Sequence, residues 1–80
     1  MIGAEIQKIV AEGTRALEGA QTAAAVREAF AAANAADELL ERGLKLKQFA
    51  SDEELEAARE PLRILWMQAW AAKNARKRSK

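Results

Sequence analysis

Residues 62–70 read Leu-Arg-Ile-Leu-Trp-Met-Gln-Ala-Trp and hold both tryptophans of the chain. At about 100° per residue, a helix through this stretch has one apolar face directed at a core. That face is made by Leu55, Leu62, Leu65, Trp66 and Ala69. Ile64 and Met67 lie off this face, and Trp70 lies at its edge. Because a small domain buries one face of a helix, a second apolar face predicts contact with another chain.

The second apolar face supplies the candidate protein interface, which consists of Ile64, Met67 and Trp70. Tryptophan and methionine are frequent in interfaces because they offer a large, adaptable contact area. Trp66 is predicted to be in the core, and Trp70 is compatible with either the edge of the core or the interface. The alternative is that the rest of the chain wraps around this helix and buries both faces itself.

The third helix has a clear start and an interruption within it. Ser51 and Glu54 match a capping box, with Ser51 as the N-cap and Glu54 at N3. Pro61 removes one backbone hydrogen bond and clashes with the preceding turn. We therefore predict that the helix kinks near Pro61 or splits there, and that it continues to about Ala75.

A first helix is predicted over residues 3–18, where apolar residues recur at helical spacing. These residues are Ile2, Ile6, Ile9, Val10 and Leu17. Gly13 interrupts the pattern. It is either tolerated on the packed side, where it lets a neighbouring helix approach, or it breaks the segment into two short helices. Gly19 is predicted to be the C′ residue.

A second helix is predicted from about Ala23 to Arg42, with Thr22 as its N-cap. Gly43 is predicted as its C′ residue, with Leu44 making the hydrophobic contact of a Schellman motif. Asp37 falls on the inner face, where an unpaired charge is costly. A position at the rim or an ion pair with another segment is expected, and contact with a basic partner is the alternative. The inner face is predicted to be Val26, Ala29, Phe30, Ala33 and Leu40.

Residues 43–50 are predicted to link the second and third helices. We expect the apolar side chains Leu44, Leu46 and Phe49 to tuck under the helices while Lys45 and Lys47 stay solvated. A short strand over residues 44–47 is the alternative, although the sequence offers it no partner strand. No sustained heptad pattern is evident, which argues against a long coiled coil.

Composition limits both the size of the core and the chemistry that the chain can perform. Half of the 80 residues are hydrophobic, but half of those are alanine, so a core built by one chain is thin. The chain has no cysteine and no histidine, and its four glycines are far apart. Thiolate and histidine ligands, a histidine base and a glycine-rich phosphate loop are thereby excluded. We predict no enzymatic activity, no cofactor, no metal and no small-molecule substrate.

Charge is distributed unevenly along the chain. Residues 1–72 carry 8 Lys/Arg and 12 Asp/Glu, a net charge of −4, whereas residues 73–80 carry a net charge of +5. This second segment is predicted to be a basic tail, frayed or disordered. Nucleic acid or an acidic partner is the alternative ligand for a cluster of cations. The cations of the tail are Lys73, Arg76, Lys77, Arg78 and Lys80.

The sequence therefore predicts an all-α protein, a small bundle of three main helices in a single domain over residues 1–72. The expected function is a non-enzymatic protein–protein interaction module, such as an adaptor, inhibitor or assembly factor, that docks by a helix face as a homodimer or against another protein. The alternative is a nucleic-acid-associated protein that uses the basic tail. With no membrane span and no signal peptide evident, a cytoplasmic location is expected. The composition is also typical of phage or bacterial accessory proteins.

Overall fold

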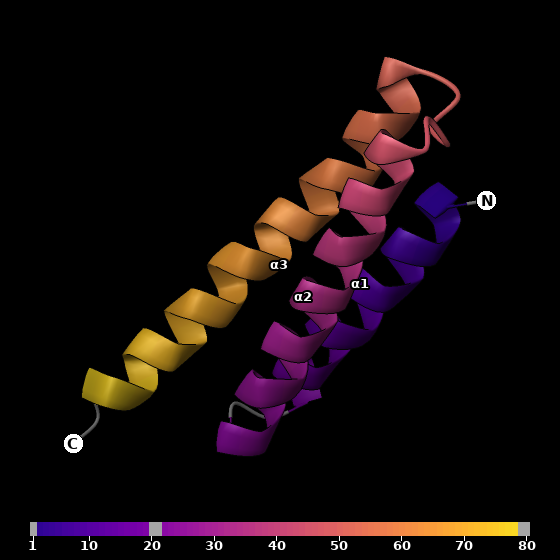
Figure 1. Cartoon of the computed structure of the whole chain (residues 1–80). Coiled ribbons are helices and arrows are strands. Elements are labelled where there is room, and N and C mark those ends of the chain that lie inside the picture. Colours follow the sequence, from indigo (N-terminus) through magenta and orange to yellow (C-terminus); the bar gives the residue numbers. More distant parts are fainter. Residues whose placement is uncertain (1, 20–21, 79–80) are drawn as a thin grey trace.

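The computed structural model describes residues 2–19 and 22–78, with side chains up to Ala75. These residues form three helices, α1 (Ile2–Gly19), α2 (Ala23–Lys45) and α3 (Asp52–Arg78). The chain runs down α1, back along α2 and down again along α3, so α1 and α3 are parallel and α2 opposes both (Figure 1). The bundle is slender, with extents of 46 × 17 × 17 Å. The predicted all-α class and the three main helices are confirmed.

Apart from Ala25 at the start of α2, the buried positions of each helix recur at alternating intervals of three and four residues. This is the heptad spacing of coiled-coil-like bundles. The interpretation that the sequence lacks a heptad pattern was therefore wrong, because many core positions hold alanine or glycine and do not stand out as apolar. These positions are Gly3, Ile6, Val10, Gly13 and Leu17 in α1, Val26, Ala29, Ala33, Ala36, Leu40 and Gly43 in α2, and Ala58, Leu62, Leu65, Ala69 and Ala72 in α3.

Gly13 is the point at which α1 approaches both other helices. A Cβ atom at this position would lie 2.9 Å from the Cβ of Ala32 on α2 and 2.9 Å from Cδ2 of Leu65 on α3. The missing side chain therefore allows the three helices to meet. The prediction of one unbroken first helix, with Gly13 on its packed side, is confirmed.

Two glycines were wrongly assigned as left-handed C′ residues, since no described glycine has a positive φ. Gly19 is the last residue of α1. Gly43 lies inside α2, where a Cβ atom would come within 2.7 Å of the Phe49 ring and 2.8 Å of Ile2. Gly43 thus provides room for side chains that cover the end of the bundle, and α2 continues past it to Lys45.

The predicted Schellman motif exists, but it lies four residues further along the chain. Lys47 takes the left-handed conformation, with φ of 54°. The Gln48 N–H donates to the Gly43 carbonyl at 2.8 Å, and the Lys47 N–H donates to the Leu44 carbonyl at 3.3 Å. Both bonds are those of a Schellman motif with Lys47 at C′. As a result, α2 is longer than predicted, and only a short loop remains before α3.

The side chains of this connection behave differently from one another. Phe49 is half-buried against the core, as predicted. Leu44 and Leu46 are 44% and 60% exposed, so the prediction that they tuck under the helices was wrong. The extension of α2 is the reason, because Leu44 now occupies a solvent-facing helical position and Leu46 caps the helix end. Residues 44–45 are helical, and no strand occurs among the residues that the structure describes.

The predicted helix starts agree with the structure. The Thr22 hydroxyl accepts a hydrogen bond from the Ala25 N–H at 3.1 Å, which caps α2. The Ser51 hydroxyl accepts one from the Glu54 N–H at 3.2 Å, which caps α3. The Glu54 carboxylate accepts from the Ala50 N–H instead of from Ser51, so the capping box closes one residue earlier than usual.

Asp37 does not lie on the buried face of α2. The neighbouring Ala36 fills the core position and is fully buried, whereas Asp37 is exposed. The predicted position at the rim is therefore confirmed, and the carboxylate keeps its contact with solvent.

Pro61 neither splits α3 nor ends it, which corrects the prediction of a split, and the predicted kink is not shown. The helix is continuous from Asp52 to Arg78 (Figure 1). Proline has no N–H, so the Ala57 carbonyl four residues earlier loses its helical partner. Gln7 of α1 replaces that partner, because its side-chain amide donates to the Ala57 carbonyl at 3.0 Å. A hydrogen bond between two helices thus compensates for the one that Pro61 removes.

Candidate protein interface on the outer face of α3

Three large apolar side chains follow one another on the outer face of α3. Ile64 is 44% exposed, Met67 is 65% exposed and Trp70 is 49% exposed. Residues three apart on a helix form an oblique ridge on its surface. The structure therefore brings the three predicted interface residues together, and we call this row the outer ridge. Met67 is the most exposed of the large hydrophobic side chains that the structure describes.

The outer ridge is anchored on α2 by aromatic contacts. The Trp70 ring meets the Phe30 ring edge-on, with centroids 5.1 Å apart and planes at 79°. Trp66 also packs on Phe30, with centroids 5.9 Å apart. Edge-to-face geometry of this kind is favourable and fixes the ring orientation. Trp66 is half-buried against the core, as predicted, whereas Trp70 rests one edge on α2 and leaves about half of its surface to solvent.

Lys73 continues the ridge by one further turn. Its Nζ atom lies 4.9 Å from the centroid of the Trp70 ring and 5.8 Å from that of Phe30. Both distances are within the range of a cation–π interaction. Arg76, Lys77 and Arg78 belong to the last turns of α3, which extends beyond the predicted end near Ala75. Lys80 lies outside the described residues.

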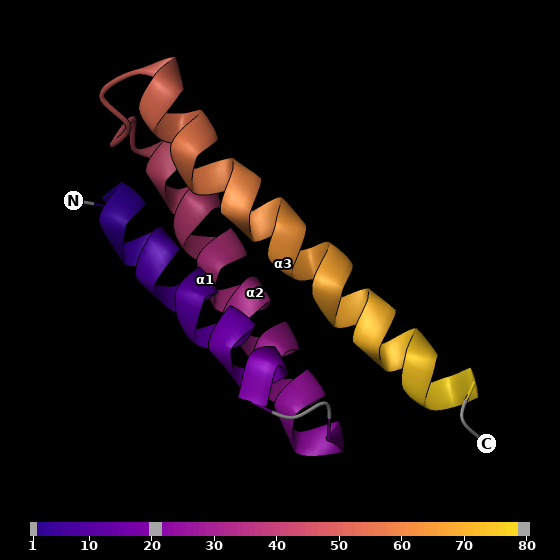
Figure 2. The ribbon, with the colours of Figure 1, turned by 180° about the vertical axis from the view of Figure 1, so that it is seen from behind.

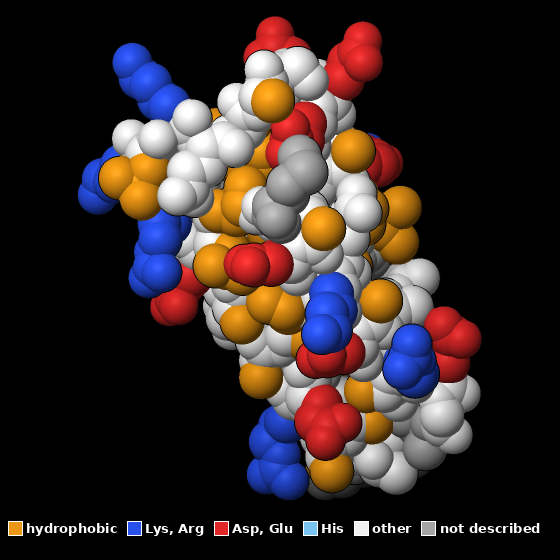
Figure 3. Space-filling view, turned by 90° about the vertical axis from the view of Figure 1, so that its right-hand side faces the viewer, with side chains coloured by type: hydrophobic (Ala, Val, Ile, Leu, Met, Phe, Trp, Pro, Cys, Tyr) orange, Lys and Arg blue, Asp and Glu red, His pale blue; other side chains and the backbone are white. Residues whose placement is uncertain are grey.

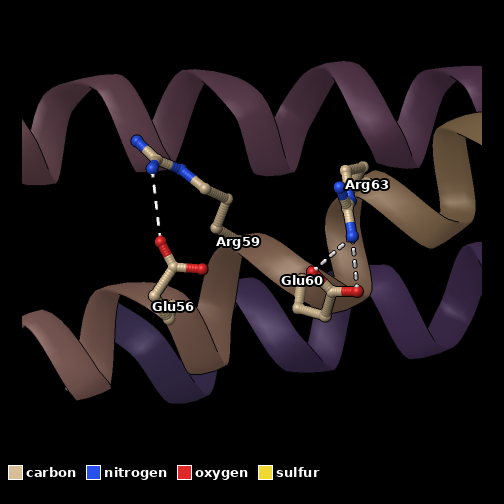
Figure 4. Close-up of polar contacts among 4 residues, drawn as sticks. All are labelled: Glu56, Arg59, Glu60 and Arg63. Carbon is tan, nitrogen blue, oxygen red and sulfur yellow. Dashed lines mark hydrogen bonds and ion pairs between the residues drawn. The ribbon is translucent and has the colours of Figure 1, made fainter.

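Two ion pairs lie on the N-terminal side of the outer ridge (Figure 4). One Arg63 nitrogen donates to both Glu60 oxygens, at 2.8 and 2.9 Å. Arg59 donates to Glu56 at 3.4 Å. The hydrogen bond to Glu60 and the negative charge of Glu60 raise the pKa of the Arg63 guanidinium above its usual value. Exposed pairs of this kind add little stability. They place two carboxylates and two guanidinium groups beside the ridge.

A second exposed apolar pair was not recognised in the sequence. Leu44 and Leu46 lie at the end of α2, together with the exposed cations Lys45 and Lys47. The alternation of leucine and lysine could have indicated an exposed segment, but it is equally typical of a half-buried loop. This pair is smaller than the outer ridge and has no aromatic member. Elsewhere, the side of the molecule that carries α1 shows acidic and basic side chains along its length, with apolar ones between them (Figure 3).

The ribbon of α3 diverges from α1 and α2 towards its C-terminus, also when seen from behind (Figure 2). A groove of about 720 Å³ lies at this end between α1 and α3. Apart from Leu17, its lining is small or polar: Thr14 and Glu18 of α1, and Gln68, Ala71, Ala72 and Ala75 of α3. Among the described residues, no polar or charged side chain is buried, and no three potential metal ligands gather.

Comparisons with known proteins give no match, whether with family models, curated proteins or solved structures. Within residues 2–19 and 22–78, no helix has the length and apolar character needed to cross a membrane.

Proposed function

We propose that this protein is a non-enzymatic interaction module that docks through the outer ridge of α3 and pairs with a second copy of itself. The exposure of Ile64, Met67 and Trp70 in consecutive turns is the observation that carries this proposal. Its mechanism is occupancy: the bound chain blocks, bridges or recruits another protein without changing a covalent bond. Adaptors, inhibitors and assembly factors work in this way, including accessory proteins of phages and bacteria.

The thinness of the core supports self-association. Half of the buried hydrophobic residues that the structure describes are alanines, and only Ile6 and Leu65 are both large and fully buried. A chain that places alanine inside and tryptophan outside gains additional apolar burial by pairing. Burying the outer ridge would add about 25 cal/mol for each Å² of apolar surface removed from water. A small scaffold with a limited core is commonly stabilised by such oligomerisation.

Solution mass and one charge substitution test this proposal. Light scattering at two protein concentrations about tenfold apart should show a dimer that dissociates on dilution. Met67→Asp places a carboxylate at the centre of the ridge, where burial would be costly. We expect this variant to be monomeric while its circular dichroism stays helical, because Met67 is 65% exposed and does not support the core.

Leu46→Asp is the matched control. The exposed fraction of Leu46, 60%, is similar to that of Met67, but Leu46 lies at the end of α2 and away from the outer ridge. Leu46→Asp should leave the mass unchanged. A native chain that remains monomeric at the higher concentration would refute the homodimer, and a Met67→Asp variant that still pairs would show that the ridge is not the contact surface.

Nucleic-acid binding by the basic C-terminal segment remains the alternative, and it predicts a different outcome. Removal of residues 73–80 would abolish a gel shift with duplex DNA, and affinity for DNA would fall steeply with salt. The structure gives one of these cations another role, since Lys73 lies over the Trp70 ring. A gel shift that persists after removal of residues 73–80 would refute this alternative.

A further inference from the structure

Charge along α3 separates on either side of the outer ridge. The N-terminal segment, residues 52–60, holds five carboxylates and one arginine. The last turns of the helix, residues 73–78, hold four cations and no carboxylate. The ridge from Ile64 to Trp70 lies between these two segments. We call the first segment the acidic end and the second the basic end.

On the outer face of α3 the described side chains show the acidic end of this gradient, and the cations at positions 76–78 follow in the sequence. Positions on this face follow the same three-and-four spacing as the core positions, and each of those with a described side chain is exposed. They are Glu53, Glu56, Glu60, Arg63, Met67, Trp70 and Asn74. The face therefore passes from carboxylates through apolar side chains towards the basic end. Met67 and Trp70 are the apolar residues of this row, and with Ile64 beside them they supply the apolar contact by which a helix packs on a partner helix.

We propose that the second copy lies antiparallel, with the two α3 helices crossing near Met67 and the acidic end of each beside the basic end of the other. This inference rests on the proposed homodimer. A two-fold interface brings the same patch of both copies together, so charge must be self-complementary. A parallel pair would place carboxylates beside carboxylates and cations beside cations, which is unfavourable. Antiparallel packing pairs unlike charges and also opposes the two helix dipoles.

The position of the two-fold axis follows from the ridge itself. With the axis at Met67, that residue meets its own copy, and Ile64 of each chain faces Trp70 of the other. Glu60 and Asn74 both lie seven positions from Met67, so they face each other across the pair. Residues 56–78 of each α3 overlap, a contact of about 35 Å at 1.5 Å per residue. This length covers the whole ridge and reaches both charged ends.

Arg63 has a specific role in this arrangement. It lies four positions before Met67, so it faces the turn that contains Ala71 and Trp70 of the second copy. About half of the Trp70 surface is available to a partner, because only one edge rests on Phe30. A guanidinium over an exposed indole is a favourable cation–π pair. In the single chain the Arg63 guanidinium is bonded to Glu60 on the same face, so this contact would exchange or share that bond.

Cysteine cross-linking tests the orientation, and the absence of natural cysteine makes each introduced thiol unique. Met67→Cys should form a disulfide-linked dimer under mild oxidation. Glu60→Cys and Asn74→Cys should each stay largely uncross-linked alone, while an equal mixture of the two should cross-link. All three positions are exposed, so these changes leave the core intact. Leu46→Cys, which is also exposed, measures the background from random collision.

The outcomes separate this inference from the homodimer proposal. A dimer in which Glu60→Cys and Asn74→Cys each cross-link alone would be parallel, which overturns the antiparallel arrangement and leaves the homodimer standing. A dimer in which no ridge position cross-links above the Leu46→Cys background also overturns it. Monomers at every concentration refute both. As a second readout, raising the salt concentration should weaken an antiparallel dimer at least about threefold by screening unlike charges, whereas it would strengthen a parallel one.

Discussion

The two faces of α3 differ in the apolar side chains that they carry. A simple hydrophobic core would bury the largest ones, but three large apolar side chains lie on the exposed face and alanine fills most of the buried positions. The buried positions of the inner face are Leu62 and Leu65 together with three alanines, Ala58, Ala69 and Ala72, while Leu55 and Trp66 pack on the core from its edges. The outer face holds isoleucine, methionine and tryptophan, all of them exposed. Hydrophobicity alone therefore does not decide which side of this helix faces the core.

Distance between helices decides it. The inner face must approach α1 closely enough for Leu65 to fill the space left at Gly13. Small residues at the other inner positions permit that approach, and larger ones would push the helices apart. The outer face has no such constraint within one chain. Large apolar residues fit there without pushing the helices apart, and the proposed partner would cover the part of them that α2 leaves exposed.

The largest contrast between the two faces is expected from Leu65→Ala and Ile64→Ala. Leu65 is fully buried and Ile64 is 44% exposed. Leu65→Ala should lower the free energy of unfolding by about 2–5 kcal/mol through lost transfer energy and a cavity. Ile64→Ala should lower it by less than about 1 kcal/mol. Urea unfolding followed by circular dichroism measures both.

Both substitutions are best made in the Met67→Asp chain, because association would otherwise add to the apparent stability of the folded state. Equal losses from Leu65→Ala and Ile64→Ala would contradict the distinction between an inner and an outer face. In that case the rest of the chain would have to bury both faces.

An intermediate effect on stability is expected at Gly13 of α1, against which Leu65 of the inner face packs. Gly13→Ala should cost about 1–3 kcal/mol by overpacking, offset in part by about 1 kcal/mol of helix propensity. The Cβ atom of Ala32 is fixed to its backbone, so α2 must move to accommodate the added methyl group. Gly19→Ala is the control, because a Cβ atom there meets nothing within 4 Å.

Gly19→Ala should leave stability unchanged or raise it by up to about 1 kcal/mol, because glycine is the poorer helix former. Thermal unfolding of the two variants should therefore shift in opposite directions. Stabilisation by Gly13→Ala would show that α1 and α2 have room to spare at this point.

The sequence predicted the elements of this fold better than their register. The caps at Thr22 and Ser51 were found because a hydroxyl before a helical segment has a specific hydrogen-bonding role. The heptad was missed because alanine and glycine fill core positions as readily as surface ones. The end of α2 was misplaced because Gly43 looks like a C′ residue. A glycine that makes room for Phe49 and Ile2 is recognisable only when those side chains are in place.

The candidate interface was predicted in its composition but not in its surroundings. Helical phase alone separates Ile64 and Met67 from the core face, and the structure exposes both. The contact of Trp70 with Phe30 joins residues on two helices, so it depends on how α2 and α3 are aligned along the bundle. Sequence spacing within one helix carries no information about that alignment. The same limit explains why the bond from Gln7 to the Ala57 carbonyl was not foreseen.

The smallest effect lies at the margin between the two faces, where Pro61 removes a hydrogen bond from α3. Gln7→Ala should cost about 0.5–1.5 kcal/mol, because it leaves the Ala57 carbonyl without the donor that replaces the proline N–H. In a Pro61→Ala background the backbone supplies that donor again, so Gln7→Ala should then cost less. A double-mutant cycle in chemical denaturant measures the difference, which we expect to be about 0.5–1 kcal/mol. Gln68→Ala controls for the loss of an exposed glutamine, because this side chain lines the groove beside α1 and is open to solvent. Additive effects of Gln7→Ala and Pro61→Ala would mean that α3 stays continuous through Pro61 without help from α1, and that packing of its inner face is sufficient to hold it.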